Sequence, residues 1–242
     1  MSEFNIEVEG GKAVRLPTAG KYCDRDIVVT ATGGGSDEYW DTFWDACQDN
    51  GNRTNYQYAF AYKGWTENNF KPKYNMSPTN ADYMFRYSNI EGSLVELLEN
   101  AGVTLDFGNS QAMTYVFADC PITEIGIIDT RSASDLYRMF WQTTKVEKIE
   151  KIILKDDGSQ QLNAFVNCLA LKEIRFEGKI GVSESLAQSR YLSVESVQSI
   201  IDHLKDLTGA TAQTLTIHAE VGAKLTQAQK DAVSAKNWTL VY

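Results

Sequence analysis

The sequence predicts an α/β solenoid, in which short coils of chain stack on one another in parallel. One pattern recurs along the chain: a small or apolar residue, a phenylalanine, a small residue three positions later, and apolar positions that lead into a strand. Its clearest copy is Leu162–Phe176, Leu-Asn-Ala-Phe-Val-Asn-Cys-Leu-Ala-Leu-Lys-Glu-Ile-Arg-Phe. The phenylalanines that mark the copies are Phe60, Phe85, Phe117, Phe140 and Phe165. Because one unit cannot bury its own apolar face, several copies are expected to stack into one core.

The spacing of the copies indicates one insertion. The phenylalanines are 25, 32, 23 and 25 residues apart. Within the long second interval, Ser93 and Glu96 have the spacing of a capping box, and Gly102 follows the apolar residues after them. A helix inserted between two copies therefore explains the interval. The strands that we expect are Val103–Phe107, Glu124–Asp129, Ile149–Lys155 and Glu173–Glu177.

The N-terminal part differs from the repeats. Apolar and polar residues alternate from Phe4 to Val8, and residues 1–32 predict a small all-β module of three short strands. Such a module is marginal alone, so we expect it to dock onto another chain, a copy of itself or the rest of the protein. Residues 33–36 form a Gly-rich linker. Residues 37–54 predict a helix with a broad apolar face that caps the first coil.

The C-terminal part also changes character. Residues 55–191 hold the stacked repeat coils. Residues 192–242 predict an α/β cap of helix, strand, helix and strand. Apolar residues share one helical face from Val194 to Leu207. The strands are expected at Thr214–Ala219 and Trp238–Tyr242, with a short helix between them. This end would cover the open edge of the stack, which otherwise invites aggregation.

Composition excludes several classes of partner. The chain has 23 Lys and Arg against 32 Asp and Glu, a formal net charge of −9, and it lacks the basic stripe of a nucleic-acid binder. No apolar stretch approaches the roughly 20 residues that a membrane helix needs, so no membrane insertion is expected. The segment Met1–Glu7 has neither the basic nor the apolar region of a signal peptide. We therefore expect synthesis in the cytoplasm, and release by a route such as lysis if the protein acts outside a cell.

No metal or cofactor is predicted. The four cysteines, Cys23, Cys47, Cys120 and Cys168, form no C-x-x-C pair. Because Cys120 and Cys168 occupy the same position of the repeat, where a small residue packs inside the coil, buried free thiols are the favoured interpretation and a disulfide the alternative. The segment Asp156–Ser159 resembles part of a calcium loop but lacks the alternating ligands and the distal glutamate of an EF-hand, so we expect a plain turn.

The sequence contains no convincing catalytic constellation, and we do not expect an enzyme. The two histidines, His203 and His218, are predicted on a helix and a strand, away from any candidate nucleophile. The alternative is a sugar-cleaving groove, with paired carboxylates flanked by aromatic side chains. Its residues would be Tyr62, Trp65, Tyr74 and Trp141, with Asp129 and Asp135 as the acids. The simpler interpretation places Trp65 in the core and the acids in solvated turns.

Binding is expected at exposed positions between the repeat anchors. Aromatic residues and arginine often anchor protein interfaces, which makes four such positions candidates. These positions are Tyr62, Arg138, Trp141 and Tyr191.

The segment Ala164–Phe176 resembles the BspA-type (Treponema-like) leucine-rich repeat, whose units read roughly A-F-x-x-C-x-x-L-x-x-I-x-L. The resemblance is good over Val116–Phe176, weak over Asn55–Phe107, and absent before Asn50 and after Gly178. Members of that family are mostly bacterial surface or secreted binding proteins, and the family has no catalytic motif. The resemblance thus implies a short leucine-rich-repeat-like coil stack that binds a partner.

Both flanks add a second resemblance. The segment Val8–Val29 is similar to a module at the start of tail-associated proteins of phages and prophages of gut bacteria, and Leu215–Leu240 is similar to the end of repeat proteins from the same source. These resemblances imply a phage virion protein, in the tail or otherwise surface-exposed. Its N-terminal module would bind other virion proteins, and its repeat domain a host surface protein or glycan. The alternative is a bacterial surface adhesin-like protein outside any virion, and a homo-oligomer remains open in either case.

Overall fold

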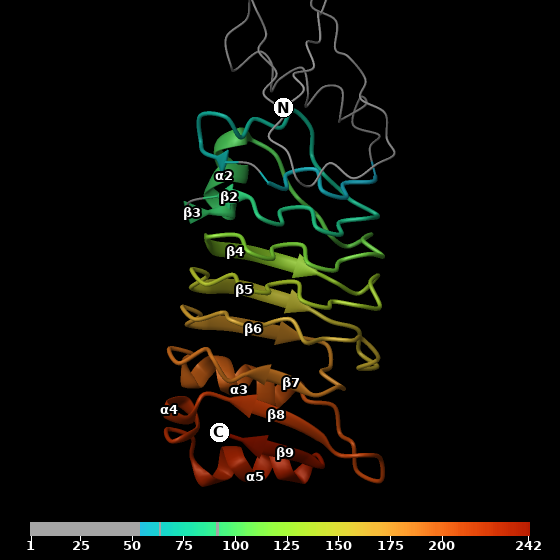
Figure 1. The fold of residues 1–242 in the computed structure, drawn as a ribbon. Coiled ribbons are helices and arrows are strands. Elements are labelled where there is room, and N and C mark those ends of the chain that lie inside the picture. The colour runs from blue at the N-terminus through green and yellow to red at the C-terminus, as the bar shows by residue number, and fades with distance from the viewer. Residues whose placement is uncertain (1–53, 63, 91) are drawn as a thin grey trace, which may run out of the picture.

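The computed structural model of the protein describes residues 54–62, 64–90 and 92–242. This part of the chain is α/β, with strands and helices arranged in layers that follow one another along the long axis to the C-terminus (Figure 1). The strands pair in parallel throughout it. The predicted β module, the Gly-rich linker and all but the last residue of the predicted capping helix lie outside the described residues.

The strands of the described residues form three parallel sheets. The first consists of β1 (Gly64–Trp65) and β2 (Asn89–Ile90). The second has the order β3 (Gly92–Ser93), β4 (Ile122–Asp129), β5 (Lys148–Ile153) and β6 (Glu173–Glu177). The third has the order β7 (Glu184–Leu186), β8 (Gln213–Ile217) and β9 (Trp238–Val241). In the second sheet Ile125, Ile149 and Ile174 are in register, so the same face of each strand is buried.

The helices occupy the intervals between strands. Helix α2 (Leu94–Ala101) fills the long second interval, which confirms the predicted insertion. The Ser93 side chain accepts a hydrogen bond from the Glu96 amide at 3.3 Å, and Gly102 ends the helix in the left-handed conformation. The other helices are α3 (Val194–His203), α4 (Ala219–Gly222) and α5 (Gln227–Ala235).

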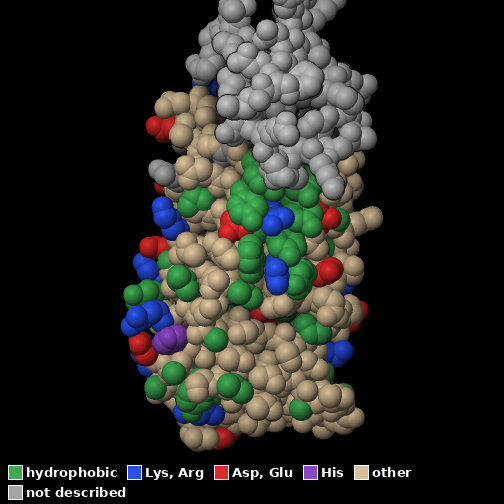
Figure 2. Space-filling model, in the orientation of Figure 1, with side chains coloured by type: hydrophobic (Ala, Val, Ile, Leu, Met, Phe, Trp, Pro, Cys, Tyr) green, Lys and Arg blue, Asp and Glu red, His purple; other side chains and the backbone are tan. Residues whose placement is uncertain are grey.

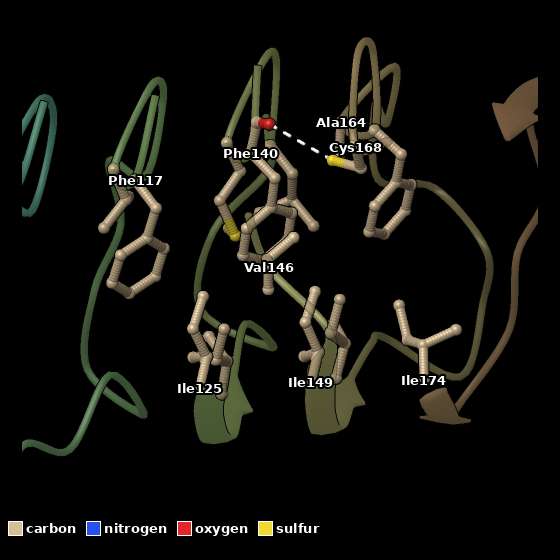
Figure 3. Packing of buried hydrophobic residues seen from close by; sticks show 14 of the residues in the cluster. Phe117, Ile125, Phe140, Val146, Ile149, Ala164, Cys168 and Ile174 are labelled. Carbon is tan, nitrogen blue, oxygen red and sulfur yellow. Dashed lines mark hydrogen bonds between the residues drawn. The ribbon is translucent and has the colours of Figure 1, made fainter. Parts of the chain in front are cut away.

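The five repeat phenylalanines form one column in the core. Each is buried, and each ring stacks on the ring of the next layer. The centroid distances are 4.7 Å for Phe60 and Phe85, 5.4 Å for Phe85 and Phe117, 5.7 Å for Phe117 and Phe140, and 5.4 Å for Phe140 and Phe165. Figure 3 shows the rings of Phe117 and Phe140 in successive layers, above the row of strand isoleucines. The repeat thus places one aromatic ring per layer at the same depth.

The small residue three positions after the phenylalanine ties successive layers together. The Thr143 hydroxyl donates to the Phe117 carbonyl at 2.9 Å, and the Cys168 thiol donates to the Phe140 carbonyl at 3.3 Å (Figure 3). Both Cys120 and Cys168 are buried free thiols, which confirms the favoured interpretation and makes the disulfide alternative wrong. Burial raises the pKa of both thiols, because a thiolate would lose its solvation there.

Two predicted elements are shorter than expected. The strand predicted at Val103–Phe107 is a single bridge between Leu105 and Met76, because Asp106 turns the chain by accepting a hydrogen bond from the Gly108 amide. The helix predicted to reach Leu207 ends at His203. There the chain leaves the helix to pair with Ile180: the Ile180 amide donates to the His203 carbonyl, and the Lys205 amide donates to the Ile180 carbonyl.

Other differences lie near the C-terminus. The predicted strand Thr214–Ala219 stops at Ile217. His218, predicted on that strand, instead caps helix α4, because its side chain accepts a hydrogen bond from the Glu220 amide. Strand β7 has no counterpart in the sequence prediction and lies within the range assigned to the repeats. It carries Glu184, whose buried carboxylate accepts hydrogen bonds from the backbone amides of Asn163, Ala164 and Ser185.

Candidate binding surface

Every repeat phenylalanine lies between two residues whose backbone is left-handed. These residues come two positions before and two positions after it, with φ between 54° and 68°. The pairs are Tyr58 and Tyr62, Tyr83 and Tyr87, Tyr115 and Asp119, Arg138 and Gln142, and Asn163 and Asn167. The repeated turn drives the phenylalanine into the core and leaves its two flanking side chains on the outside, one layer above the next.

The residue types at these positions are informative. Asparagine and glycine visit the left-handed region readily, whereas another L-residue there costs roughly 1–2 kcal/mol. The last layer has the favourable choice, Asn163 and Asn167, while earlier layers have tyrosine or arginine in the same conformation, such as Tyr83, Tyr87 and Arg138. Residues held in such conformations at a cost cluster at functional sites. The strain therefore points to the outward side chains of the earlier layers.

These tyrosines stack into columns outside the core. Tyr83 stacks on Tyr58 at 4.7 Å and on Tyr115 at 5.2 Å, with ring planes within 15° of parallel. Tyr62 and Tyr87 form a second contact at 5.2 Å. Tyr58, Tyr62 and Tyr87 are exposed, whereas Tyr83 and Tyr115 are half-buried. Each aromatic pair contributes on the order of 1 kcal/mol beyond its burial, which offsets part of the backbone strain.

Two further aromatic residues close the column at its other end. Tyr137 meets the Tyr115 ring edge-on, with centroids 5.7 Å apart. Trp141 also meets Tyr115 edge-on, at 6.4 Å.

Two arginines lie among the rings. The Arg86 guanidinium carbon is 5.3 Å from the Tyr83 ring centre, 4.7 Å from that of Tyr87 and 4.9 Å from that of Tyr115. The Arg138 guanidinium is 5.9 Å from the Tyr115 ring, and one of its nitrogens donates to the Tyr115 hydroxyl at 3.2 Å. Cation–π contacts of this kind fix the guanidinium planes against the rings.

Together these residues form what we call the tyrosine-arginine face. Its members are Tyr58, Tyr62, Tyr83, Arg86, Tyr87, Tyr115, Tyr137, Arg138 and Trp141. Figure 2 shows hydrophobic side chains gathered around basic ones on this side of the molecule, with acidic side chains at the margin. A contiguous exposed aromatic surface of this kind marks an interaction site more often than a lone exposed residue does.

Arg86 lies close enough to Asp119 to favour its charged form, although the two form no ion pair among the described residues. The half-buried Asp119 has a raised pKa, chiefly because burial disfavours its charged form, although Arg86 and the Tyr87 hydroxyl oppose that effect. The pKa of Arg86 is also raised: burial alone would lower it, but the hydrogen bond to the Tyr87 hydroxyl at 3.3 Å and the nearby tyrosines outweigh burial. Within the part of the chain that the structure describes, the buried atoms Arg86 Nε and Asp119 Oδ2 have no hydrogen-bond partner.

The four binding candidates from the sequence separate into two places. Tyr62, Arg138 and Trp141 belong to the tyrosine-arginine face. Tyr191 is 58% exposed in a later layer, beside Arg190, which pairs with Glu220 at 3.0 Å.

The residues of the alternative sugar-cleaving groove have other roles. Trp65 is buried, and its indole donates to the Phe60 carbonyl at 2.9 Å, so it lies in the core and lines no groove. Tyr74 is exposed. Asp129 forms an ion pair with Arg131 at 2.6 Å, which helps to hold its pKa below the ordinary range. Asp135 accepts a hydrogen bond from the Tyr137 amide.

Sequence reasoning missed the core of this face. Tyr83, Arg86, Tyr87 and Tyr115 were not among the predicted binding residues. The signal was present, because the residues two positions before and after the phenylalanine are tyrosines in the first two copies and one is a tyrosine in the third. Only the observed turn shows that these positions point outward together.

Comparisons of the chain with protein-family models, curated proteins and solved structures give no match. Within the described residues, no helix is long and apolar enough to cross a membrane. The same residues hold no group of three or more side chains placed to bind a metal ion. The segment Asp156–Ser159 is a turn in which Asp157 accepts a hydrogen bond from the Ser159 amide.

Proposed function

We propose that the protein is a phage virion protein, in the tail or otherwise surface-exposed, that binds a host surface partner through its tyrosine-arginine face. The coil stack is a solenoid of the BspA-type leucine-rich-repeat kind. The observation that carries the binding role is the half-buried column of Tyr83 and Tyr115, with Arg86 held against it and the exposed Tyr87 beside it.

The composition of the face supports binding. Tyrosine, tryptophan and arginine dominate the residues that supply most of the energy in interfaces. The rings and guanidiniums already contact one another, so little side-chain entropy remains to be lost when a partner docks. The guanidinium donors of Arg86 and Arg138 that make no hydrogen bond within the described residues, apart from the buried Arg86 Nε, provide specificity.

The repeated layers support the solenoid. Five phenylalanines stack at one ring per layer, and the hydroxyl or thiol three positions later bonds back to the previous layer at Thr143 and Cys168. A stack of this kind offers an extended surface that grows by whole layers.

The virion assignment is supported by the sequence of the flanks. The segment Val8–Val29 has the pattern of a tail-associated module, which would bind the other virion proteins. Mass spectrometry of purified particles from the phage or prophage that encodes the chain tests this part. We expect peptides of the protein in the particles, and their absence would contradict the assignment.

A bacterial surface adhesin would use the same face without a virion. The two roles differ in where the protein is found. Immunolabelling of uninfected cells cured of the prophage separates them: labelled cell surfaces favour the adhesin, and unlabelled cells with labelled particles favour the virion protein. No catalytic role is proposed for either.

A further inference from the structure

We propose that the ligand of the tyrosine-arginine face is an acidic polysaccharide, whose uronate carboxylates are bound by Arg86 and Arg138. This inference rests on the proposed function, because it assigns a ligand class to the same face.

The guanidinium groups of Arg86 and Arg138 have N–H groups that donate no hydrogen bond within the described residues. Arg86 donates one hydrogen bond, to the Tyr87 hydroxyl at 3.3 Å, and Arg138 donates one, to the Tyr115 hydroxyl at 3.2 Å. In the part of the chain that the structure describes, neither guanidinium lies within ion-pair distance of a carboxylate. Arg131 and Arg190, by contrast, form ion pairs with Asp129 and Glu220. A guanidinium has five N–H donors in a planar fork that matches a carboxylate. Both guanidiniums therefore keep N–H donors from which an anionic ligand can accept hydrogen bonds.

The placement of the two arginines sets a condition on that anion. The Tyr115 ring lies between their layers, 4.9 Å from the Arg86 guanidinium and 5.9 Å from that of Arg138. Their layers are two steps apart, about 10 Å at the usual spacing of parallel strands. A ligand that reaches both guanidiniums carries carboxylates about 10 Å apart.

An alternating polysaccharide meets this condition, because a neutral sugar separates successive uronates. The C–H groups of the neutral sugar would pack against the edges of Tyr87 and Tyr115, whose hydroxyls accept hydrogen bonds from Arg86 and Arg138. The Asp135 carboxylate and the Gln142 amide are polar groups in the same layers that can bond sugar hydroxyls.

Densely charged ligands fit less well. The chain carries a net charge of −9, and Asp82, Asp119 and Asp135 lie in the same layers as the two arginines. A nucleic acid or a run of glutamates would bring its charges against these carboxylates, which disfavours binding. A sparse polyanion avoids most of that repulsion.

The experiment is isothermal titration calorimetry of the full chain at low salt with three probes. The first is an oligosaccharide of hyaluronan, in which uronate and neutral sugar alternate. The second is the same oligosaccharide with its carboxyls reduced to alcohols, and the third is polyglutamate of similar length. We expect the first to bind at least about tenfold more tightly than either of the others.

Substitutions of Arg86 and Arg138 test whether their planar guanidinium groups bind the carboxylates. Arg86→Lys and Arg138→Lys keep the charge but lose the planar donors, so each is expected to weaken hyaluronan binding by about tenfold. Arg131→Lys, which lies outside the face, is the matched control and should leave it unchanged. The inference is overturned if hyaluronan does not bind, if the lysine variants bind it as wild type does, or if polyglutamate binds more tightly, which would indicate an acidic protein partner.

Failure of this inference is distinguishable from failure of the proposed function. Cell binding that requires the face, together with no binding of hyaluronan, rejects the ligand class and keeps the function. Cell binding that is indifferent to Arg86 and Arg138 rejects both.

Discussion

The guanidinium of Arg86 lies 4.9 Å from the ring centre of Tyr115, which belongs to the next layer of the stack. The same guanidinium contacts Tyr83 and Tyr87 in its own layer. One cation thus links two layers on the outside, as the stacked phenylalanines link them on the inside. The outer surface is consequently held by the same repeat that builds the core.

Replacing Tyr83 by asparagine should separate stability from binding. Asparagine relieves left-handed strain of roughly 1 kcal/mol but removes two ring contacts, with Tyr58 and Tyr115, worth on the order of 1 kcal/mol each. The free energy of unfolding should therefore fall by only about 1 kcal/mol. Binding to host cells should fall, because the tyrosine column is broken. Thermal melting and a cell-binding titration measure the two effects.

The matched control for that change is Asn167→Ala. It alters the same kind of left-handed position in a layer beyond the tyrosine column. Normal binding by the control and weak binding by Tyr83→Asn is the expected pattern. Equal binding by all three proteins would remove Tyr83 from the site.

Truncating Phe140 to alanine should destabilise the fold strongly. Its ring is fully buried between Phe117 and Phe165, so the substitution leaves a cavity in the middle of the column. The expected loss is about 3–5 kcal/mol in the free energy of unfolding, measured by urea denaturation. Tyr137→Ala, at a half-buried outer ring, should cost much less. Similar losses for the two variants would show that the column is not the main source of stability.

Changing Thr143 to valine should have a smaller and specific effect. The hydroxyl bond to the Phe117 carbonyl is lost, but that carbonyl still accepts a hydrogen bond from the Cys120 amide. We therefore expect a loss of about 1 kcal/mol in the free energy of unfolding, near the net value of one hydrogen bond. A loss of several kcal/mol would mean that the hydroxyl has a further role in the layer contact.

Glu184 should make stability depend on pH. Burial raises its pKa to about 7 from the ordinary 4.5, against the effect of the amides of Ser185, Asn163 and Ala164. The folded state then binds the proton more tightly than the unfolded state. The contribution of Glu184 is fully present below pH 4.5, falls as the pH rises toward 7, and is flat above it, a change of up to about 3 kcal/mol.

The Glu184→Gln variant keeps the shape of the protonated side chain and removes the titration. Unfolding by urea at a series of pH values should show a difference between the two proteins that favours the variant above pH 7 and shrinks toward pH 4.5. A difference that does not change with pH would indicate that Glu184 does not exchange a proton in this range.

Part of the fold follows directly from local pattern. Strand β6 occurs at Glu173–Glu177 as expected, because alternation and an adjacent clear repeat define its register. The buried phenylalanine column follows from the repeat as well. Helix α2 was found because Ser93 and Gly102 mark both of its ends.

The remaining features depend on contacts between distant residues. Leu204 continues the apolar face of α3, yet it pairs with Ile180 as a strand, which helical periodicity does not reveal. The tyrosine-arginine face was only partly predicted, because unequal repeat spacing hides which tyrosines share a column. Tyr83 and Tyr115 are 32 residues apart, and only the stacked layers bring their rings to 5.2 Å.

The most direct measurement is a host-cell binding titration of the full chain and two triple variants that keep the fold, as checked by circular dichroism. One variant replaces Arg86, Tyr115 and Arg138 by alanine. The control replaces three charged residues of the second sheet by alanine, namely Lys151, Glu173 and Arg175. We expect the first variant to bind at least about tenfold more weakly than wild type and the control to bind normally. Equal binding by wild type and the first variant would contradict the assignment of the binding surface.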